Sequence, residues 1–107
     1  MNKVTAYIPL AKLPTYSIGE VIRTLTIVAG GATHTQAHGD WQAPDGQMVS
    51  EPITLVSWLV PDGAAPGTAF SANLNRLIAE LRASGEQSVL LERTHNIAVE
   101  FHERESS

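Results

Sequence analysis

The alternation of apolar and polar residues along the chain predicts four strands. Residues 4–8 alternate, are rich in β-branched side chains, and end at Pro9. Residues 33–41 alternate most regularly: one face would carry Thr33, Thr35, Ala37, Gly39 and Trp41, and the other His34, Gln36, His38 and Asp40. Residues 53–60 are apolar on both faces, which predicts a central strand, and residues 89–91 begin the fourth.

Two stretches with apolar residues at spacings of three and four predict helices. In the first, Ser17 and Glu20 match a capping box, and Gly30 supplies a left-handed cap at the other end. Its apolar stripe is Ile18, Val21, Ile22, Leu25, Val28 and Ala29. The second begins near Thr68 and ends before Gly85, with the stripe Phe70, Leu74, Leu77, Ile78 and Leu81.

The order strand, helix, strand, strand, helix, strand predicts the fold class α+β, a ferredoxin-like βαββαβ split sandwich. The turn 43–46 would join the two middle strands, and both helices would cover one face of a four-stranded antiparallel sheet. After a break or bulge at 94–96, the alternation of residues 97–101 predicts either a bulged continuation of the fourth strand or a short fifth strand. We expect one domain over residues 1–102 and a frayed tail over 103–107.

The face of the sheet away from the helices would be bare. Apolar candidates for this face are Tyr7, Trp41, Trp58 and the apolar half of the last strand. Exposed apolar patches of this kind usually mark an interface. The sequence therefore predicts a homodimer formed through the open sheet face.

Composition narrows the class of protein. The chain has 107 residues, of which 43% are hydrophobic and 17% charged, so it can form a packed core. The absence of cysteine excludes disulfides, thiolate metal sites and cysteine nucleophiles. We see no signal peptide, and the longest apolar run, Ile53 to Val60, is too short to cross a bilayer, so we expect a cytoplasmic protein without membrane contact.

The net charge of −4 is unevenly distributed. No Lys or Arg lies between Arg23 and Arg76, whereas Asp40, Asp45, Glu51 and Asp62 all lie there. Because nucleic-acid binding depends on cationic contacts to phosphates, we expect no direct nucleic-acid binding through this region. It is either an ordinary acidic surface or a face for a basic protein partner.

Candidate catalytic and metal-binding groups are few. On one strand His34 and His38 would lie about 13 Å apart, too far to share a metal ion, although an approach by His102 stays open. His38 and Asp40 share a strand face and are the nearest approach to an acid–base pair. No nucleophile motif is present, and no cofactor or metal is expected. The positive end of the second helix, at Gly67–Thr68, could hold an anion.

Several short motifs resemble those of a known group of proteins. They are Gly30-Gly31-Ala32-Thr33, Gly39-Asp40-Trp41, Asp45-Gly46 and Glu51-Pro52. In this order they resemble small uncharacterised ferredoxin-like proteins carried by phages, plasmids and their hosts. The resemblance covers residues 30–52 and implies a mobile-element setting without implying a reaction.

Three hypotheses about function are compatible with these features. The first is a non-catalytic binding or inhibitory module that uses Asp40, Trp41, Asp45 and Glu51 to dock on a basic protein, such as a nucleic-acid-binding defence effector inhibited by an anti-CRISPR-like protein. The second is a small dimeric α+β-barrel enzyme, a cofactor-free oxygenase or isomerase, or a sponge for a signalling nucleotide. The candidate ligand pocket for these alternatives is Tyr7, His34, His38 and Trp58, with Trp41 as a further wall. The third is a subunit that only self-assembles.

Overall fold

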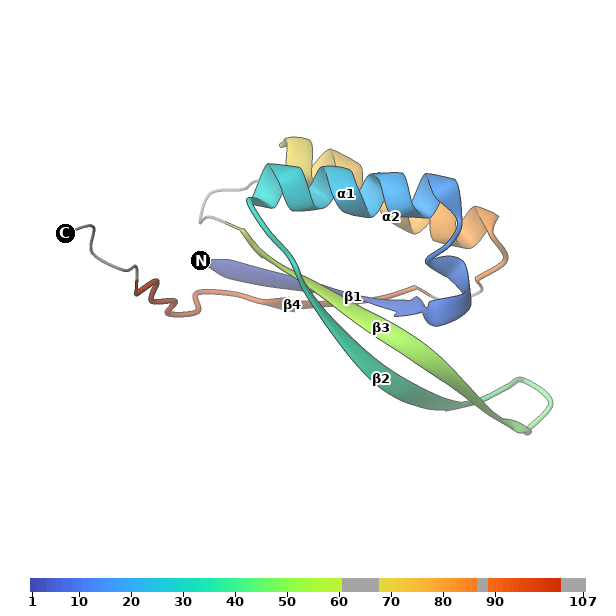
Figure 1. The fold of residues 1–107 in the computed structure, drawn as a ribbon. Coiled ribbons are helices and arrows are strands. Elements are labelled where there is room, and N and C mark those ends of the chain that lie inside the picture. Colours follow the sequence, from blue (N-terminus) through green and yellow to red (C-terminus); the bar gives the residue numbers. More distant parts are fainter. Residues whose placement is uncertain (61–67, 87–88, 103–107) are drawn as a thin grey trace.

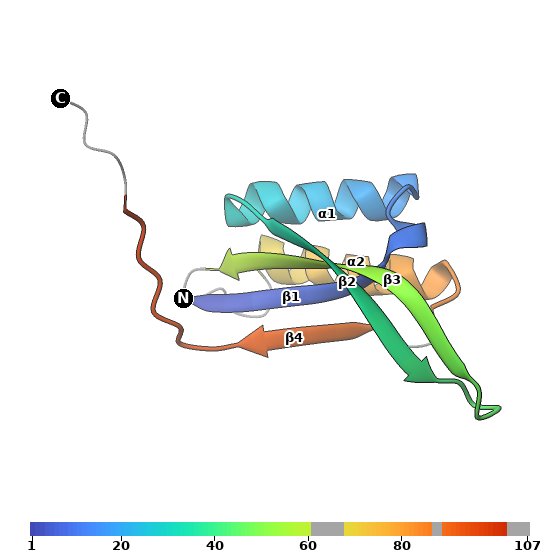
Figure 2. The same ribbon diagram turned by 60° about the horizontal axis from the view of Figure 1, so that its bottom comes forward.

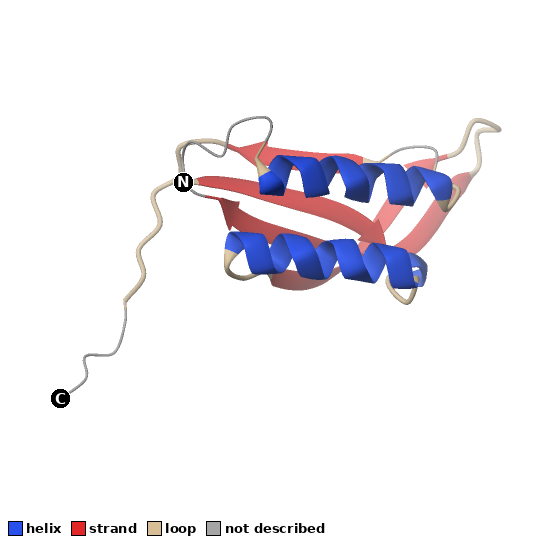
Figure 3. Ribbon diagram, turned by 90° about the horizontal axis from the view of Figure 1, so that it is seen from above, coloured by secondary structure: helices blue, strands red, loops and turns tan. Residues whose placement is uncertain are grey.

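The computed structural model describes residues 1–60, 68–86 and 89–102, and it confirms the α+β class. Two helices pack on one face of a four-stranded antiparallel sheet (Figure 1). The elements in chain order are β1 (Asn2–Pro9), the short 3-10 helix η1 (Leu10–Lys12), α1 (Tyr16–Ala29), β2 (Thr33–Gln42), β3 (Met48–Val60), α2 (Ala69–Ala83) and β4 (Leu90–Thr94). The helices lie next to each other over the sheet when the molecule is seen from above (Figure 3).

The strand order is β2-β3-β1-β4, so β3 and β1 are central and β2 and β4 form the edges. This confirms the central position predicted for residues 53–60, although β3 begins five residues earlier, at Met48. In the register, Val4 lies opposite Trp58 on β3 and opposite Arg93 on β4. Because directly opposed residues share a face, this register determines which side chains lie under the helices.

The core lies between the sheet and the helices. From the sheet it receives Val4, Ala6, Ile8, Val56, Trp58 and Val60, and from the helices Ile18, Val21, Ile22, Leu25, Phe70, Leu74, Leu77 and Leu81. The expectation that Trp58 lies on the open face is wrong, because its side chain is fully buried under the helices. Its Nε1 donates to Thr26 Oγ1 on α1 at 3.1 Å, and its ring meets Phe70 edge-on.

The first helix begins earlier than the capping box predicts. Its N-cap is Thr15, the Gly19 amide donates to the Thr15 carbonyl, and no side chain caps this end. Ser17 therefore lies inside the first turn of α1. The short helix η1 ends at Lys12, and α1 already begins at Tyr16, one residue before Ser17. The other end agrees with the prediction: Gly30 has φ +90°, which favours glycine, and its amide donates to the Thr26 carbonyl.

The C-terminal part of the described chain forms no fifth strand. After β4, Asn96 adopts φ 55° and its amide donates to Asn2 Oδ1. The Ile97 amide then donates to the Met1 carbonyl, which precedes the first residue of β1, so the pairing with β1 ends here. Residues 97–102 therefore run without strand structure despite their alternation. The predicted tail 103–107 and the loop at Asp62 lie outside the described residues.

Two buried threonines of the sheet differ in their hydrogen bonding. Thr5 Oγ1 and Ser57 Oγ are 2.8 Å apart, whereas Thr54 Oγ1 is fully buried and has no partner among the described residues. A buried unpaired hydroxyl costs about 1–3 kcal/mol in desolvation. We therefore expect Thr54→Val to raise the free energy of unfolding by about 1 kcal/mol.

The matched variant Thr5→Val should act in the opposite direction, because it leaves Ser57 without its partner and costs about 1 kcal/mol. Urea titrations of the two variants and the parent protein, followed by circular dichroism, measure both effects. A loss of stability in Thr54→Val would show that its hydroxyl is paired.

Candidate functional site

The distal half of the β2–β3 hairpin projects from the body of the protein. We call residues 39–52 the arm. It extends past the ends of both helices (Figures 1 and 2), and none of its residues is buried. In the register Asp40 lies opposite Ser50, and Trp41 lies opposite Val49. The arm thus brings together the four residues predicted to bind a partner, which are Asp40, Trp41, Asp45 and Glu51.

The tip of the arm is held by its turn. The Gly46 amide donates to the Ala43 carbonyl, and Gly46 has φ +87°. Asp45 Oδ1 accepts from the Gln47 amide at 3.0 Å, and Asp40 Oδ1 accepts from Ser50 Oγ. Both carboxylates thus contact uncharged donors, which leaves their negative charge unneutralised within the arm.

Apolar side chains accompany the acidic groups on the arm. The exposed fraction of Trp41 is 45% and that of Met48 is 67%. The arm contains no Lys or Arg, and Asp40, Asp45 and Glu51 give it three negative charges. Trp41 and Glu51 share one face of the arm, Asp40 lies on the other face, and Asp45 lies in the turn. An exposed tryptophan on an acidic hairpin is suited to a partner that offers an apolar pocket with a basic rim.

The sheet face away from the helices carries an apolar row. Thr35, Leu55, Tyr7 and Leu90 lie directly opposite one another across β2, β3, β1 and β4. Leu55 and Tyr7 are half-buried, and Leu90 is 58% exposed. Lys3 and Glu92 lie on the same face, with Glu92 directly opposite Thr5. We call Tyr7, Ile53, Leu55 and Leu90 the open-face patch.

The four residues that the sequence predicted to form a ligand pocket do not lie together in the fold. Tyr7 lies on the open face, whereas His34, His38 and Trp58 lie on the helix side of the sheet. His34 and His38 are exposed, and Trp58 is enclosed in the core. Trp41 lies on the open-face side of the arm. The four predicted pocket residues therefore share no cavity among the described parts of the chain.

The histidines do not form a metal cluster. Within residues 1–60, 68–86 and 89–102, no three His, Cys, Asp or Glu side chains are close enough to hold a metal ion. His102 Nε2 lies 2.9 Å from Glu100 Oε2 on an exposed segment. The expectation that the protein needs no metal or cofactor stays a prediction. None of the helices in the described ranges is long and apolar enough to cross a membrane.

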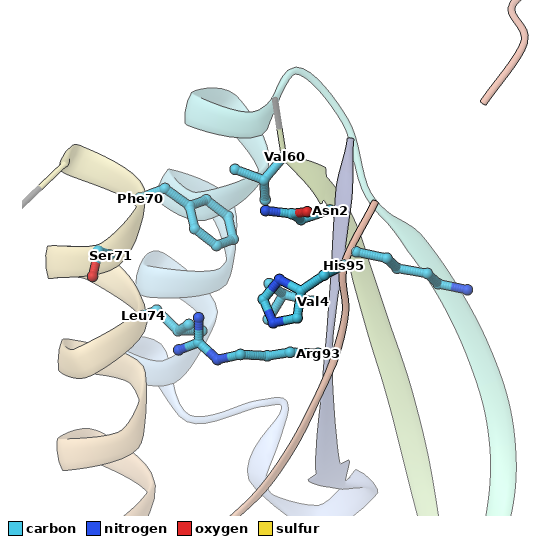
Figure 4. Close-up of a pocket in the computed structure, with 9 residues that line it drawn as sticks. Asn2, Val4, Val60, Phe70, Ser71, Leu74, Arg93 and His95 are labelled. Carbon is cyan, nitrogen blue, oxygen red and sulfur yellow. The ribbon is translucent and has the colours of Figure 1, made fainter. Parts of the chain in front are cut away.

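A small cavity that the sequence did not predict lies between α2 and the β1–β4 edge of the sheet. Its volume is about 140 Å³. Its floor is apolar, formed by Val4, Val60, Phe70 and Leu74, and its polar lining includes Asn2, Ser71, Arg93 and His95 (Figure 4). Arg93 and His95 are two residues apart, a spacing that places both on one face of an extended chain. This spacing, together with the anion expected at the start of the second helix, is the sequence signal for the site.

Comparison with known proteins shows the fold. No protein-family model matches the chain, and no curated protein matches it. A solved phage SAM lyase in complex with S-methyl-5'-thioadenosine is similar, with 22% identity and a TM-score of 0.57 over 87% of this chain and 79% of the lyase. The phage SAM lyase in its apo state gives 20% identity and 0.55, over 95% and 92%.

A second group of similar structures comes from Pyrococcus horikoshii. CutA1 from Pyrococcus horikoshii is 15% identical, with a TM-score of 0.61 over 94% of this chain and 87% of CutA1. At these identities the similarity establishes a shared architecture. The protein is thus a small α+β domain of the ferredoxin-like split-sandwich type, similar in fold to phage SAM lyase and CutA1.

Proposed function

We propose that the protein is a non-catalytic binding module that docks its arm on a basic protein partner. One observation carries the proposal: Asp40, Trp41, Asp45 and Glu51 gather on a hairpin that projects beyond the helices and buries none of its own residues. Because none of its residues is buried, the arm contributes little to the core. A two-stranded hairpin is also only marginally stable by itself in water. We therefore infer that the length and the composition of the arm serve contact with another molecule.

The chemistry of the arm selects the class of partner. Its three carboxylates have no cation near them along residues 39–52, so a partner's Lys and Arg side chains would supply the missing charges. Complementary charge raises the association rate and sets orientation, and a buried tryptophan supplies affinity. A protein with a basic groove, such as a nucleic-acid-binding defence effector, has this surface. The module would then act as an inhibitor by occupying the groove.

A phage or plasmid setting supports this choice of partner. The motifs of residues 30–52 resemble those of mobile-element proteins, and two of the similar structures are from phage. Proteins carried by such elements meet host effectors that bind nucleic acid through basic surfaces. We therefore propose an anti-defence role, of the anti-CRISPR kind or another.

The test is a charge reversal of the arm. In the variant Asp40→Lys, Asp45→Lys, Glu51→Lys, we expect partner capture from the native host to fall to background, because attraction becomes repulsion. Capture is measured by affinity purification with mass spectrometry at low and high salt. The matched control Glu20→Lys, Glu80→Lys, Glu86→Lys changes the net charge equally but lies on the helices and the segment after α2.

The control variant should capture the same protein as the parent chain, and raising the salt concentration should release it. Circular dichroism must show both variants folded. If the arm variant and the parent capture the same protein equally, docking through the acidic arm is wrong.

We further propose that two copies assemble through the open-face patch. The patch is apolar, while Lys3 and Glu92 on the same face carry opposite charges. In a two-fold interface the same surface meets itself, so Lys3 of one copy can pair with Glu92 of the other. This arrangement would cover the apolar row.

A second candidate function is the binding or cleavage of a nucleoside-containing substrate. It is favoured by one finding, the similarity to a phage SAM lyase in complex with S-methyl-5'-thioadenosine. Calorimetric titration with that nucleoside, and an assay for its release from S-adenosylmethionine, separate the two functions. Binding or release that survives charge reversal of the arm would favour the enzyme.

A further inference from the structure

We propose that the cavity between α2 and the β1–β4 edge binds a small oxyanion, specifically a phosphate group. The Arg93 side chain reaches from β4 toward Leu74 on α2, and the His95 ring lies beside Val4 (Figure 4). Ser71, in the first turn of α2, lines the opposite wall. Arg93 and His95 thus meet the start of α2 across one cavity, which Lys3 also lines.

The charge around this cavity is opposite to that of the whole protein. The net charge of the chain is −4, yet no Asp or Glu is among the described residues that line the cavity. The Arg93 guanidinium forms no ion pair with any residue of the described ranges, so its five donors remain available. A cationic cavity in an acidic protein attracts an anion.

The remaining polar groups in the lining are donors. Asn2 Oδ1 accepts from the Asn96 amide, which leaves its amide nitrogen free to donate, and Figure 4 shows this nitrogen on the side facing α2. Thr68, the N-cap of α2, satisfies the Ser71 amide, and the positive end of the helix dipole lies at this turn. Asn2, Ser71, Arg93 and His95 together offer more donors than a carboxylate accepts. A phosphate has more acceptor oxygens and matches the guanidinium fork.

The size of the cavity restricts the ligand. Sites that enclose drug-sized molecules occupy roughly 300–1,000 Å³, whereas this one occupies about 140 Å³. It therefore has room for free phosphate or for the terminal phosphate of a larger ligand.

The test is a titration of the full chain with inorganic phosphate, followed by amide chemical shifts at constant ionic strength. We expect saturable shifts at Ser71, Arg93 and His95. Arg93→Gln should weaken binding about tenfold or more, since a hydrogen-bonded charge is lost. The phosphate affinity of Arg93→Lys should lie between those of the parent protein and Arg93→Gln, because lysine keeps the charge and lacks the guanidinium fork. Arg82→Gln, in the last turn of α2, is the matched control and should bind like the parent.

The outcomes decide the proposal in either direction. Phosphate binding that exceeds acetate binding and depends on Arg93 supports the site, and titration with a phosphate monoester shows whether a larger ligand is accepted. Equal weakening by Arg82→Gln and Arg93→Gln would mean general charge attraction and would overturn it. Unshifted Ser71 and His95 amides would overturn it as well. If Arg93→Gln fails to fold, Arg93→Lys and the shift map decide. The arm variants should bind phosphate normally, so this test is independent of partner docking.

Discussion

Replacing Trp58 with alanine is expected to destabilise the protein by about 3–5 kcal/mol, the range for large aromatic residues removed from a core. Trp58 is fully buried, packs on Phe70 with ring centroids 6.0 Å apart, and donates to Thr26. Alanine removes the ring contact and the hydrogen bond together and leaves a cavity. Because domains of this size are stable by about 5–15 kcal/mol, this single change removes a large share of the total.

The two tryptophans form a matched pair for this experiment. Trp41→Ala should change the free energy of unfolding by less than about 1 kcal/mol, because Trp41 lies half-exposed on the arm. Trp58→Phe should lie between the two, since it keeps a ring against Phe70 and loses the bond to Thr26. Urea unfolding followed by far-ultraviolet circular dichroism avoids dependence on tryptophan emission. Equal losses at Trp41 and Trp58 would contradict the burial described above.

Placing two lysines in the open-face patch is expected to convert an assembled protein to monomers. In Leu55→Lys, Leu90→Lys, each subunit brings two like charges to the same apolar row. A two-fold interface doubles this number, and burying unpaired charge costs several kcal/mol. The apparent dissociation constant should therefore rise by at least about a hundredfold. Analytical ultracentrifugation over a concentration series measures the change.

The control for this experiment is an apolar residue outside the sheet. Ile27→Lys lies on α1 at a position that is 70% exposed, and it should leave assembly unchanged. A parent protein that stays monomeric at high concentration would rule out assembly through the patch. A parent that assembles equally well with the lysines would place the interface elsewhere.

The order of elements could be predicted from the sequence because local signals agreed. Apolar spacing of three and four identified both helices, and Gly30 identified the end of the first. Regular alternation over residues 33–41 placed Trp41 and Asp40 on opposite faces, as the register confirms. The turn at residues 43–46 then required the two middle strands to pair, and right-handed crossovers placed the helices.

The position of Trp58 could not be predicted, because β3 is apolar on both faces. Alternation divides β3 into Val56, Trp58 and Val60 on one side and Leu55 and Leu59 on the other. Either set is apolar enough for a core, and the choice depends on the pairing with β1. The helix start predicted from the capping box at Ser17 was wrong for a related reason. The path of the chain from η1 into α1 determines where the helix begins, and a local motif does not contain that path.

The two candidate sites differ in how much of each could be predicted from the sequence. The arm depends on one hairpin, so residues close in sequence, such as Asp40 and Glu51, stay close in space. The cavity at Arg93 and His95 depends on β4 pairing with β1 and on α2 crossing above them. No local pattern contains those contacts. The anion predicted at Gly67–Thr68 rested on the positive end of the second helix alone, and Gly67 lies outside the described residues. The basic side chains of Arg93 and His95 come from a later part of the chain.

The position of β1 between β3 and β4 has a consequence for how the chain is made. During synthesis, β1 can pair with β3 once residue 60 is available, whereas its other edge waits until residue 94 has emerged. Throughout that interval the backbone groups of β1 on this edge are open to strands of other nascent chains. Premature termination before β4 would make this exposure permanent, and such fragments should aggregate.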